Sequence, residues 1–136
     1  LAFTMKVGER APLYAVSSGK IVLSRLSNDE LGAYLDRVEL QRITAHTLQS
    51  KSTLRKQVSA VRQDGFAYSR EEFTPGITGI STAVIKDGDV LGTVNLAVPT
   101  ARFTESQNVA FRRELRSAAA ALGHALHADM IATYKR

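Results

Sequence analysis

Two histidines on one predicted helix are the first residues whose spacing suits chemistry. His124 and His127 lie three positions apart, and Asp129 follows shortly after them. Residues at this spacing share one face of a helix, as two ligands of a zinc ion would. The sequence shows no third ligand with matching geometry. We therefore favour surface or interface histidines, and we expect no metal and no other cofactor.

Acid–base catalysis would have to rely on the adjacent acids Glu71 and Glu72 or on the isolated His46. Neighbouring carboxylates in a loop point in different directions, and a general base needs a partner that positions it. The chain has no cysteine, no G-x-S-x-G turn and no P-loop. Turn solvation or capping is the favoured role for the two acids, and we expect no enzyme.

The overall composition is that of one soluble globular domain in a reducing cytoplasm. The chain has 136 residues, of which 44% are hydrophobic, and its formal net charge is +5. Basic residues are interspersed with acids, and the densest basic run, residues 51–62, has the spacing of an exposed helix face. Because phosphate contacts usually come as a patch, we favour a solvated face over a nucleic-acid surface.

Helices are predicted where a polar cap precedes apolar residues at helical spacing. Ser27 with Glu30 and Thr104 with Gln107 form two capping boxes, and Gly65 stands where a helix C-terminal glycine is expected. The expected helices run from Ser17 or Ser18 to about Leu26, from Ser27 through Leu35, from Ser52 or Thr53 to Gly65, and from Thr104 to about Tyr134.

Strands are predicted between these helices. Asp87 and Gly88 are a strong hairpin signal, and a loop with Pro75, Gly76 and Gly79 precedes the hairpin. Helices beside an antiparallel sheet make an α+β fold. The sheet is small for this much helix, so we expect strands upstream or from a partner. The expected strands are residues 66–68, 80–85 and 90–98, and residues 1–10 are expected to be the end of a strand that enters a turn at Gly8.

Alternation along the second hairpin strand predicts two unlike faces of the sheet. The face with Val94 and Leu96 is apolar and should face the core. The opposite face carries Asn95 and Ala97, and Ser81 continues it on the neighbouring strand. These small, partly polar side chains have two equally good interpretations. A helix or a partner subunit could pack closely against this face, or the face could line a cavity for a small ligand.

The start of the first helix is a second candidate element. Free N–H groups at a helix start favour an anion, and a glycine there lets a ligand approach the backbone. Ser17, Ser18 and Gly19 occupy this position. An ordinary helix cap is nevertheless the more common arrangement for such residues.

Several short motifs follow one another in a definite order and spacing along the chain. The segment G-E-R-A-P-L-Y-A at residues 8–15 is followed by Gly19 and Lys20. The segment G-F-A-Y at residues 65–68 is followed by the two acids and Gly76, and the paired strands lead to an exit through Pro99 and Arg102. Together, over almost the whole chain, these motifs resemble the effector-binding domain of the IclR family of bacterial transcription regulators.

This resemblance implies a GAF-like antiparallel sheet flanked by helices, in a single domain over residues 1–136 that lacks the first strands of its sheet. It also implies a small organic acid or aromatic metabolite as effector, and a homodimer or homotetramer. DNA would be contacted only through an N-terminal winged helix-turn-helix domain, which has no counterpart in this sequence. A GAF-like enzyme and a purely structural oligomerisation domain are the alternatives.

The resemblance further assigns ligand contacts to three segments. Gly79 stands where the family often has Cys or Ala, and Asn95 and Ala97 stand where it often has Ser. Val98 replaces a common glycine, and Tyr14 replaces the usual histidine, so the effector's identity does not transfer. The ligand-binding positions implied in this chain are Ser17, Gly19, Ile77, Gly79, Ser81, Asn95 and Ala97.

Overall fold

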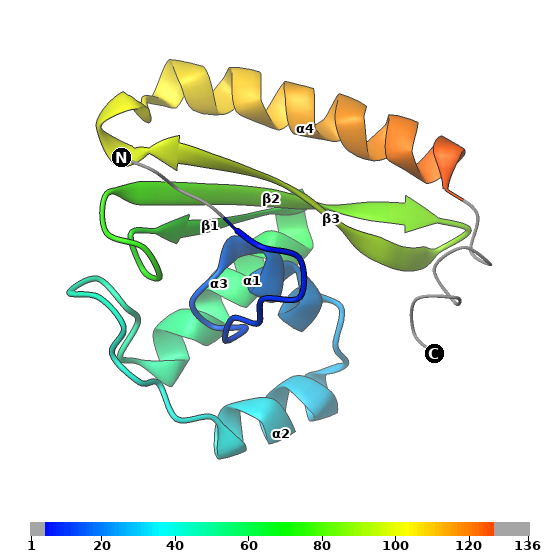
Figure 1. Ribbon diagram of the computed structural model, residues 1–136. Helices are drawn as coiled ribbons and strands as arrows, with labels where there is room; N and C mark the ends of the chain where they lie inside the picture. Colours follow the sequence, from blue (N-terminus) through cyan, green and yellow to red (C-terminus); the bar gives the residue numbers. More distant parts are fainter. Residues whose placement is uncertain (1–4, 127–136) are drawn as a thin grey trace.

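A computed structural model describes residues 5–126 of the chain (Figure 1). In this part, helices precede and follow a three-stranded antiparallel sheet, which is the predicted α+β class. The elements are α1 (Ser17–Ser24), α2 (Asn28–Arg37), α3 (Lys51–Asp64), β1 (Phe66–Arg70), β2 (Ile77–Lys86), β3 (Asp89–Pro99), a 3-10 turn (Thr100–Arg102) and α4 (Glu105–Ala125).

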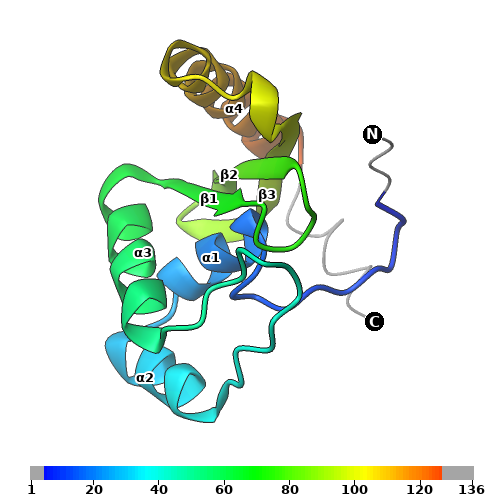
Figure 2. The ribbon, with the colours of Figure 1, turned by 90° about the vertical axis from the view of Figure 1, so that its left-hand side faces the viewer.

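The sheet is sandwiched between helices. α4 lies along one face, α1 and α3 lie against the other, and α2 packs outside them (Figures 1 and 2). Under α4, Phe66 and Ile80 pack with Leu115 in a buried cluster that Val94 and Leu96 extend. The predicted core face of the hairpin is therefore the face that α4 covers. No helix in residues 5–126 is long and apolar enough to cross a membrane.

The hairpin was predicted correctly, apart from the start of its first strand. Asp87 and Gly88 have φ values of 51° and 83°, as a tight hairpin turn requires. β2 begins at Ile77, so Gly79 lies within the strand, paired with Ser69 on β1 and Ala97 on β3, and not in a loop. The start of β2 is not apparent in the sequence. The apolar residues in the turn before β2 show no strand-like alternation of their own.

Most helix starts were predicted from local sequence signals. In both capping boxes the side chain and backbone bonds are reciprocal, as in Ser27 with Glu30. α3 begins slightly earlier than predicted because Ser50 caps it by accepting a hydrogen bond from the Thr53 N–H. Gly65 ends α3 with a φ of 83°. The expected continuation of α4 towards Tyr134 lies outside the described residues.

One prediction near the N-terminus is wrong. Neither Ser17 nor Ser18 caps α1, because the N-cap residue is Val16 and both serines lie inside the helix, which ends at Ser24. The turn predicted at Gly8 is confirmed, with a φ of 91° at that glycine. Residues 5–10 form no strand, and the first four residues of the strand end predicted there lie outside the described residues.

Candidate functional site

A hollow of about 300 Å³ lies where the start of α1 faces β2 and β3, and we call it the α1 pocket. Its wall combines hydroxyl and amide groups with apolar side chains. Among the described residues that form it, none is a lysine, arginine or histidine. The lining residues are Met5, Val16, Ser17, Ser18, Ser69, Phe73, Thr74, Ile77, Gly79, Asn95, Leu96 and Ala97.

Most residues singled out in the sequence come together at this pocket. Ser17, Ile77, Gly79, Asn95 and Ala97 line it. They arrive from the first turn of α1 and from the two strands of the hairpin, so their proximity depends on α1 packing across the sheet face opposite α4. The other two positions, Ser81 and Gly19, do not line the pocket and have different surroundings.

The first of these two is Ser81, which is fully buried and connects the helix to the hairpin. Its hydroxyl lies 2.5 Å from that of Ser17, and it donates a hydrogen bond to Oδ1 of Asn95. Since Oδ1 accepts this bond, the Nδ2 group remains the free end of the Asn95 amide. Ser81 thus orients two pocket residues without lining the pocket.

The second is Gly19, which does not line the pocket and is packed closely against Leu13. A Cβ at this position would lie 2.3 Å from the carbonyl oxygen of Leu13, a distance that no real side chain shows. α1 therefore rests directly on the preceding backbone. Gly79 differs, because a Cβ there would lie 3.0 Å from Ser17 Oγ, at the pocket wall.

The first turn of α1 offers backbone donors to the pocket. The N-cap residue Val16 has no side-chain oxygen, and the Ser17 hydroxyl is engaged with Ser81. The first intrahelical bond runs from the Lys20 N–H to the Val16 carbonyl, which leaves the N–H groups of the preceding turn free of helical acceptors. These N–H groups carry the positive end of the helix dipole, so they can hold an anion.

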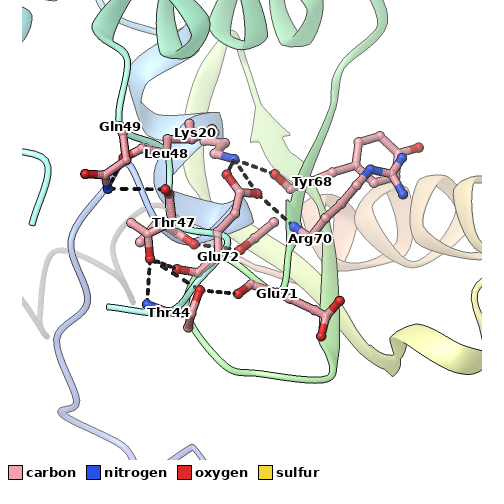
Figure 3. Close-up of polar contacts among 11 residues, drawn as sticks. Lys20, Thr44, Thr47, Leu48, Gln49, Tyr68, Arg70, Glu71 and Glu72 are labelled. Atoms are coloured by element: carbon pink, nitrogen blue, oxygen red, sulfur yellow. Dashed lines mark hydrogen bonds and ion pairs between the residues drawn. The ribbon is translucent and has the colours of Figure 1, made fainter. Parts of the chain in front are cut away.

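Sequence reasoning missed a buried ion pair behind the pocket. Lys20 Nζ lies 2.9 Å from Glu72 Oε1 and 3.0 Å from Oε2, and it also donates to the Tyr68 carbonyl at 2.7 Å (Figure 3). Burial lowers the pKa of Lys20, and the charge of Glu72 opposes that effect. The predicted capping is present at Glu72, because its Oε2 accepts a hydrogen bond from the Arg70 N–H at 2.7 Å. Turn solvation is wrong for Glu72, because its side chain is buried and bound by Lys20.

Glu71 does take part in the turn, as predicted. It accepts a hydrogen bond from the Gly76 N–H at 2.7 Å and has a φ of 57°. Thr44 and Thr47 donate to the carbonyls of Glu71 and Glu72, which fixes the segment after β1 (Figure 3). The motifs of the sequence contain Gly19–Lys20 and the two acids, but they give only their order along the chain and not the contact between them.

The described residues, 5–126, contain no cluster of metal-ligating side chains. No three His, Asp or Glu side chains there come together as metal ligands would. His124 lies exposed on α4, while His127 and Asp129 lie outside the described residues.

Comparison with known proteins decides the family. The model of the C-terminal domain of the bacterial transcriptional regulator IclR matches residues 1–124. The chain belongs to the IclR family. This confirms the family identified from the motifs, and it groups the chain with transcription regulators and not with enzymes.

Curated IclR-family relatives are about one-third identical to the chain. The regulator KdgR of Dickeya chrysanthemi is 32% identical over 115 residues, 84% of this chain and 38% of KdgR. The repressor AllR of Escherichia coli K12 is 32% identical over 126 residues, 89% of this chain and 46% of AllR. The chain thus spans less than half the length of these relatives.

Solved IclR-family structures share the fold. The C-terminal domain of E. coli KdgR is 30% identical with a TM-score of 0.78, over 86% of this chain and 72% of that one. The inducer-binding domain of a double mutant of Acinetobacter PobR, in complex with 3-hydroxybenzoic acid, is 26% identical with a TM-score of 0.83, over 93% of this chain and 73% of that one.

Proposed function

We propose that this domain binds a small organic acid, aromatic acids included, in the α1 pocket and thereby controls DNA binding by a helix-turn-helix domain outside this sequence. The observation that carries the proposal is the pairing of an uncapped α1 start with the Ser17–Ser81–Asn95 chain in one hollow. The complex of PobR with 3-hydroxybenzoic acid supports an acid of this class.

The pocket chemistry determines how such an acid would lie. Since residues 5–126 place no cationic side chain in the wall, the carboxylate would lie at the N–H groups of Ser17 and Ser18. The apolar body would contact Phe73 and Ile77, and Asn95 would bind a polar substituent. A volume of about 300 Å³ is at the lower end for ligand sites, so a single ring or a smaller molecule fits.

Ligand binding would act through quaternary structure in a cytoplasmic homodimer or homotetramer. An effector shifts such an equilibrium only by its difference in affinity for the two arrangements. Exposed apolar side chains at Val22, Ile85 and Val109 are candidates for subunit contacts. The outer edge of β3 is where upstream strands of the same domain would pair, and Met5 already lies at the pocket wall beside that strand.

A purely structural role is the alternative, and it has a specific requirement. It needs the sheet face with Asn95 to be filled by side chains. The hollow of about 300 Å³ over that face favours the sensor instead.

A thermal-shift screen of small carboxylates and aromatic acids tests the proposal. We expect at least one acid to raise the melting temperature of the wild-type domain, and Asn95→Leu to reduce that shift. Gln63→Leu, at an exposed amide on α3, is the matched control and should keep the full shift. The proposal fails if no acid stabilises the domain and Asn95→Leu leaves regulation by the full-length protein intact.

A further inference from the structure

Three arginines stack on aromatic rings beside the outer strand β1, and we call this row the arginine ladder. The guanidinium carbon of Arg70 lies 4.9 Å from the centre of the Tyr68 ring (Figure 3). Arg112 lies over the Tyr68 and Phe66 rings at 5.5 Å and 4.9 Å, and Arg116 lies 5.2 Å from the Phe66 ring. The two rings come from alternate residues of β1, and the last two arginines come from successive turns of α4. These contacts place the side chains in the order Arg70, Tyr68, Arg112, Phe66, Arg116.

Stacking holds the guanidinium groups in place without using their hydrogen-bonding capacity. An aromatic ring attracts the positive charge, but it supplies no oxygen that could accept from an N–H group. Arg70 lies over the Phe103 ring as well, at 5.2 Å, which restricts its side chain further. Side chains that are already positioned lose less conformational freedom when a ligand binds. The ladder thus presents preorganised donors at the surface.

The positive charge of the ladder is only partly neutralised. Arg112 is the one arginine in residues 5–126 that forms an ion pair, with Asp64 at 3.2 Å, and its Nε also donates to the Tyr68 hydroxyl. Arg70 and Arg116 are exposed. Two guanidinium groups therefore remain to bind an anion, one on each side of Arg112.

The chemistry and spacing of the ladder fit a row of carboxylates. A guanidinium can bind a carboxylate through two parallel N–H bonds. Arg112 and Arg116 lie one helical turn apart, which is about 6 Å along the axis of α4. Alternate side chains of an extended peptide project from one side at intervals of about 7 Å. Acidic residues at alternate positions of such a peptide would meet successive arginines.

Duplex DNA matches the ladder less well than an acidic peptide does. Proteins that bind duplex DNA commonly neutralise about 6–10 phosphates through lysine and arginine side chains. The ladder has three guanidinium groups, and one of them is already paired with Asp64. A peptide with a few carboxylates on one side needs no larger surface than this row.

A bound peptide would contact the ladder side chains and not the edge of β1. The Phe66 N–H donates to Asp64 at 3.0 Å, and the Arg70 N–H donates to Glu72 at 2.7 Å. These side chains occupy backbone groups that an added strand would need. Recognition therefore depends on the arginine side chains.

We propose that the arginine ladder is a docking surface for an acidic segment of a partner protein, with carboxylates at alternate positions of an extended chain. Successive carboxylates accept hydrogen bonds from Arg70, Arg112 and Arg116, and the two exposed arginines supply most of the attraction. No residue of the ladder lines the α1 pocket. The surface is therefore independent of the proposed effector site.

A fluorescence-anisotropy titration of the wild-type domain tests the proposal with three labelled probes. The first is a short peptide in which three glutamates alternate with serines, the second has glutamine in place of each glutamate, and the third is a short DNA duplex. We expect saturable binding of the glutamate peptide that weakens as salt is added, and no saturable binding of the glutamine peptide. The proposal is overturned if the glutamate peptide does not saturate, if the glutamine peptide binds equally well, or if the duplex binds more tightly.

Variants of exposed side chains locate the binding surface. Arg70→Gln with Arg116→Gln should weaken binding of the glutamate peptide about tenfold. Arg55→Gln with Lys56→Gln removes the same charge from an exposed part of α3 and should keep the wild-type affinity. Equal affinities in the two double variants would reject the ladder as the site.

NMR of the arginine side chains gives a test without any substitution. Saturation with the glutamate peptide should shift the Nε–H resonances of Arg70 and Arg116 in the wild-type domain. Unmoved resonances at saturation would overturn the proposal. Failure of acids to bind the α1 pocket would leave all of these results unchanged.

Discussion

Lys20 and Glu72, which lie 52 positions apart in the sequence, form an ion pair of 2.9 Å in the interior of the domain. Their side chains are only 1% and 6% exposed. The pair joins α1 to the segment that follows β1, and both of these elements contribute residues to the α1 pocket. The ion pair therefore fixes the position of α1 relative to the segment after β1, and these two elements form walls of the α1 pocket.

Breaking this pair should destabilise the domain strongly. Lys20→Met leaves the Glu72 carboxylate buried without its cation, at a cost of about 3–5 kcal/mol in the free energy of unfolding. Urea denaturation measures the loss. The double variant Lys20→Met with Glu72→Leu should recover much of it, because no buried charge remains. A double variant that is less stable than Lys20→Met alone would contradict this account.

The same pair predicts a pH dependence in the alkaline range. Burial lowers the pKa of Lys20 below the 10.5 of an exposed lysine, so the folded protein releases this proton before the unfolded chain does. Between the two values the unfolded chain binds more protons, and the free energy of unfolding rises with pH. Wild-type stability relative to Lys20→Met should increase as the pH approaches 10.5. A constant difference would show that the pKa is not lowered.

Two helical glycines should respond in opposite directions to alanine. Gly19→Ala places a Cβ 2.3 Å from the Leu13 carbonyl oxygen, so α1 must shift and the domain should lose about 1–3 kcal/mol or more. Gly32 on α2 has nothing within 4 Å of an added Cβ. Gly32→Ala should therefore gain about 0.5–1 kcal/mol from helix propensity. Thermal unfolding distinguishes the two, and equal effects would be inconsistent with the packing of α1.

A methyl group at Gly79 should change ligand selectivity. Gly79→Ala brings a Cβ to 3.0 Å from Ser17 Oγ and narrows the α1 pocket. Calorimetry should show aromatic acids losing about tenfold in affinity relative to two- and three-carbon acids. Gly92→Ala on β3, where an added Cβ meets nothing within 4 Å, is the matched control. Unchanged selectivity in Gly79→Ala would show that Gly79 does not form part of the pocket wall.

Local chemistry explains which features could be predicted from the sequence. The capping box at Ser27 and the turn at Asp87–Gly88 act over a few residues, so their signals survive without tertiary information. Alternation in β3 separated the core side chain Leu96 from Asn95 for the same reason.

Features that depend on distant contacts could not be predicted in this way. The Lys20–Glu72 pair needs α1 to pack against the end of β1, and neither residue has a local pattern that indicates burial. Gly19 was interpreted as a point of ligand approach because its contact with Leu13 exists only after α1 has packed. Ser17 was taken as a cap, but its hydroxyl contacts Ser81, 64 positions away.

Binding of an acid at the start of α1 can be tested by an NMR map of the bound site. The acid with the largest thermal shift is titrated into the isotope-labelled wild-type domain. The account predicts that the largest saturable shifts fall on the backbone amides of Ser17, Ser18, Gly79 and Asn95. Saturable shifts that leave these four amides unmoved and cluster elsewhere in the domain would contradict it.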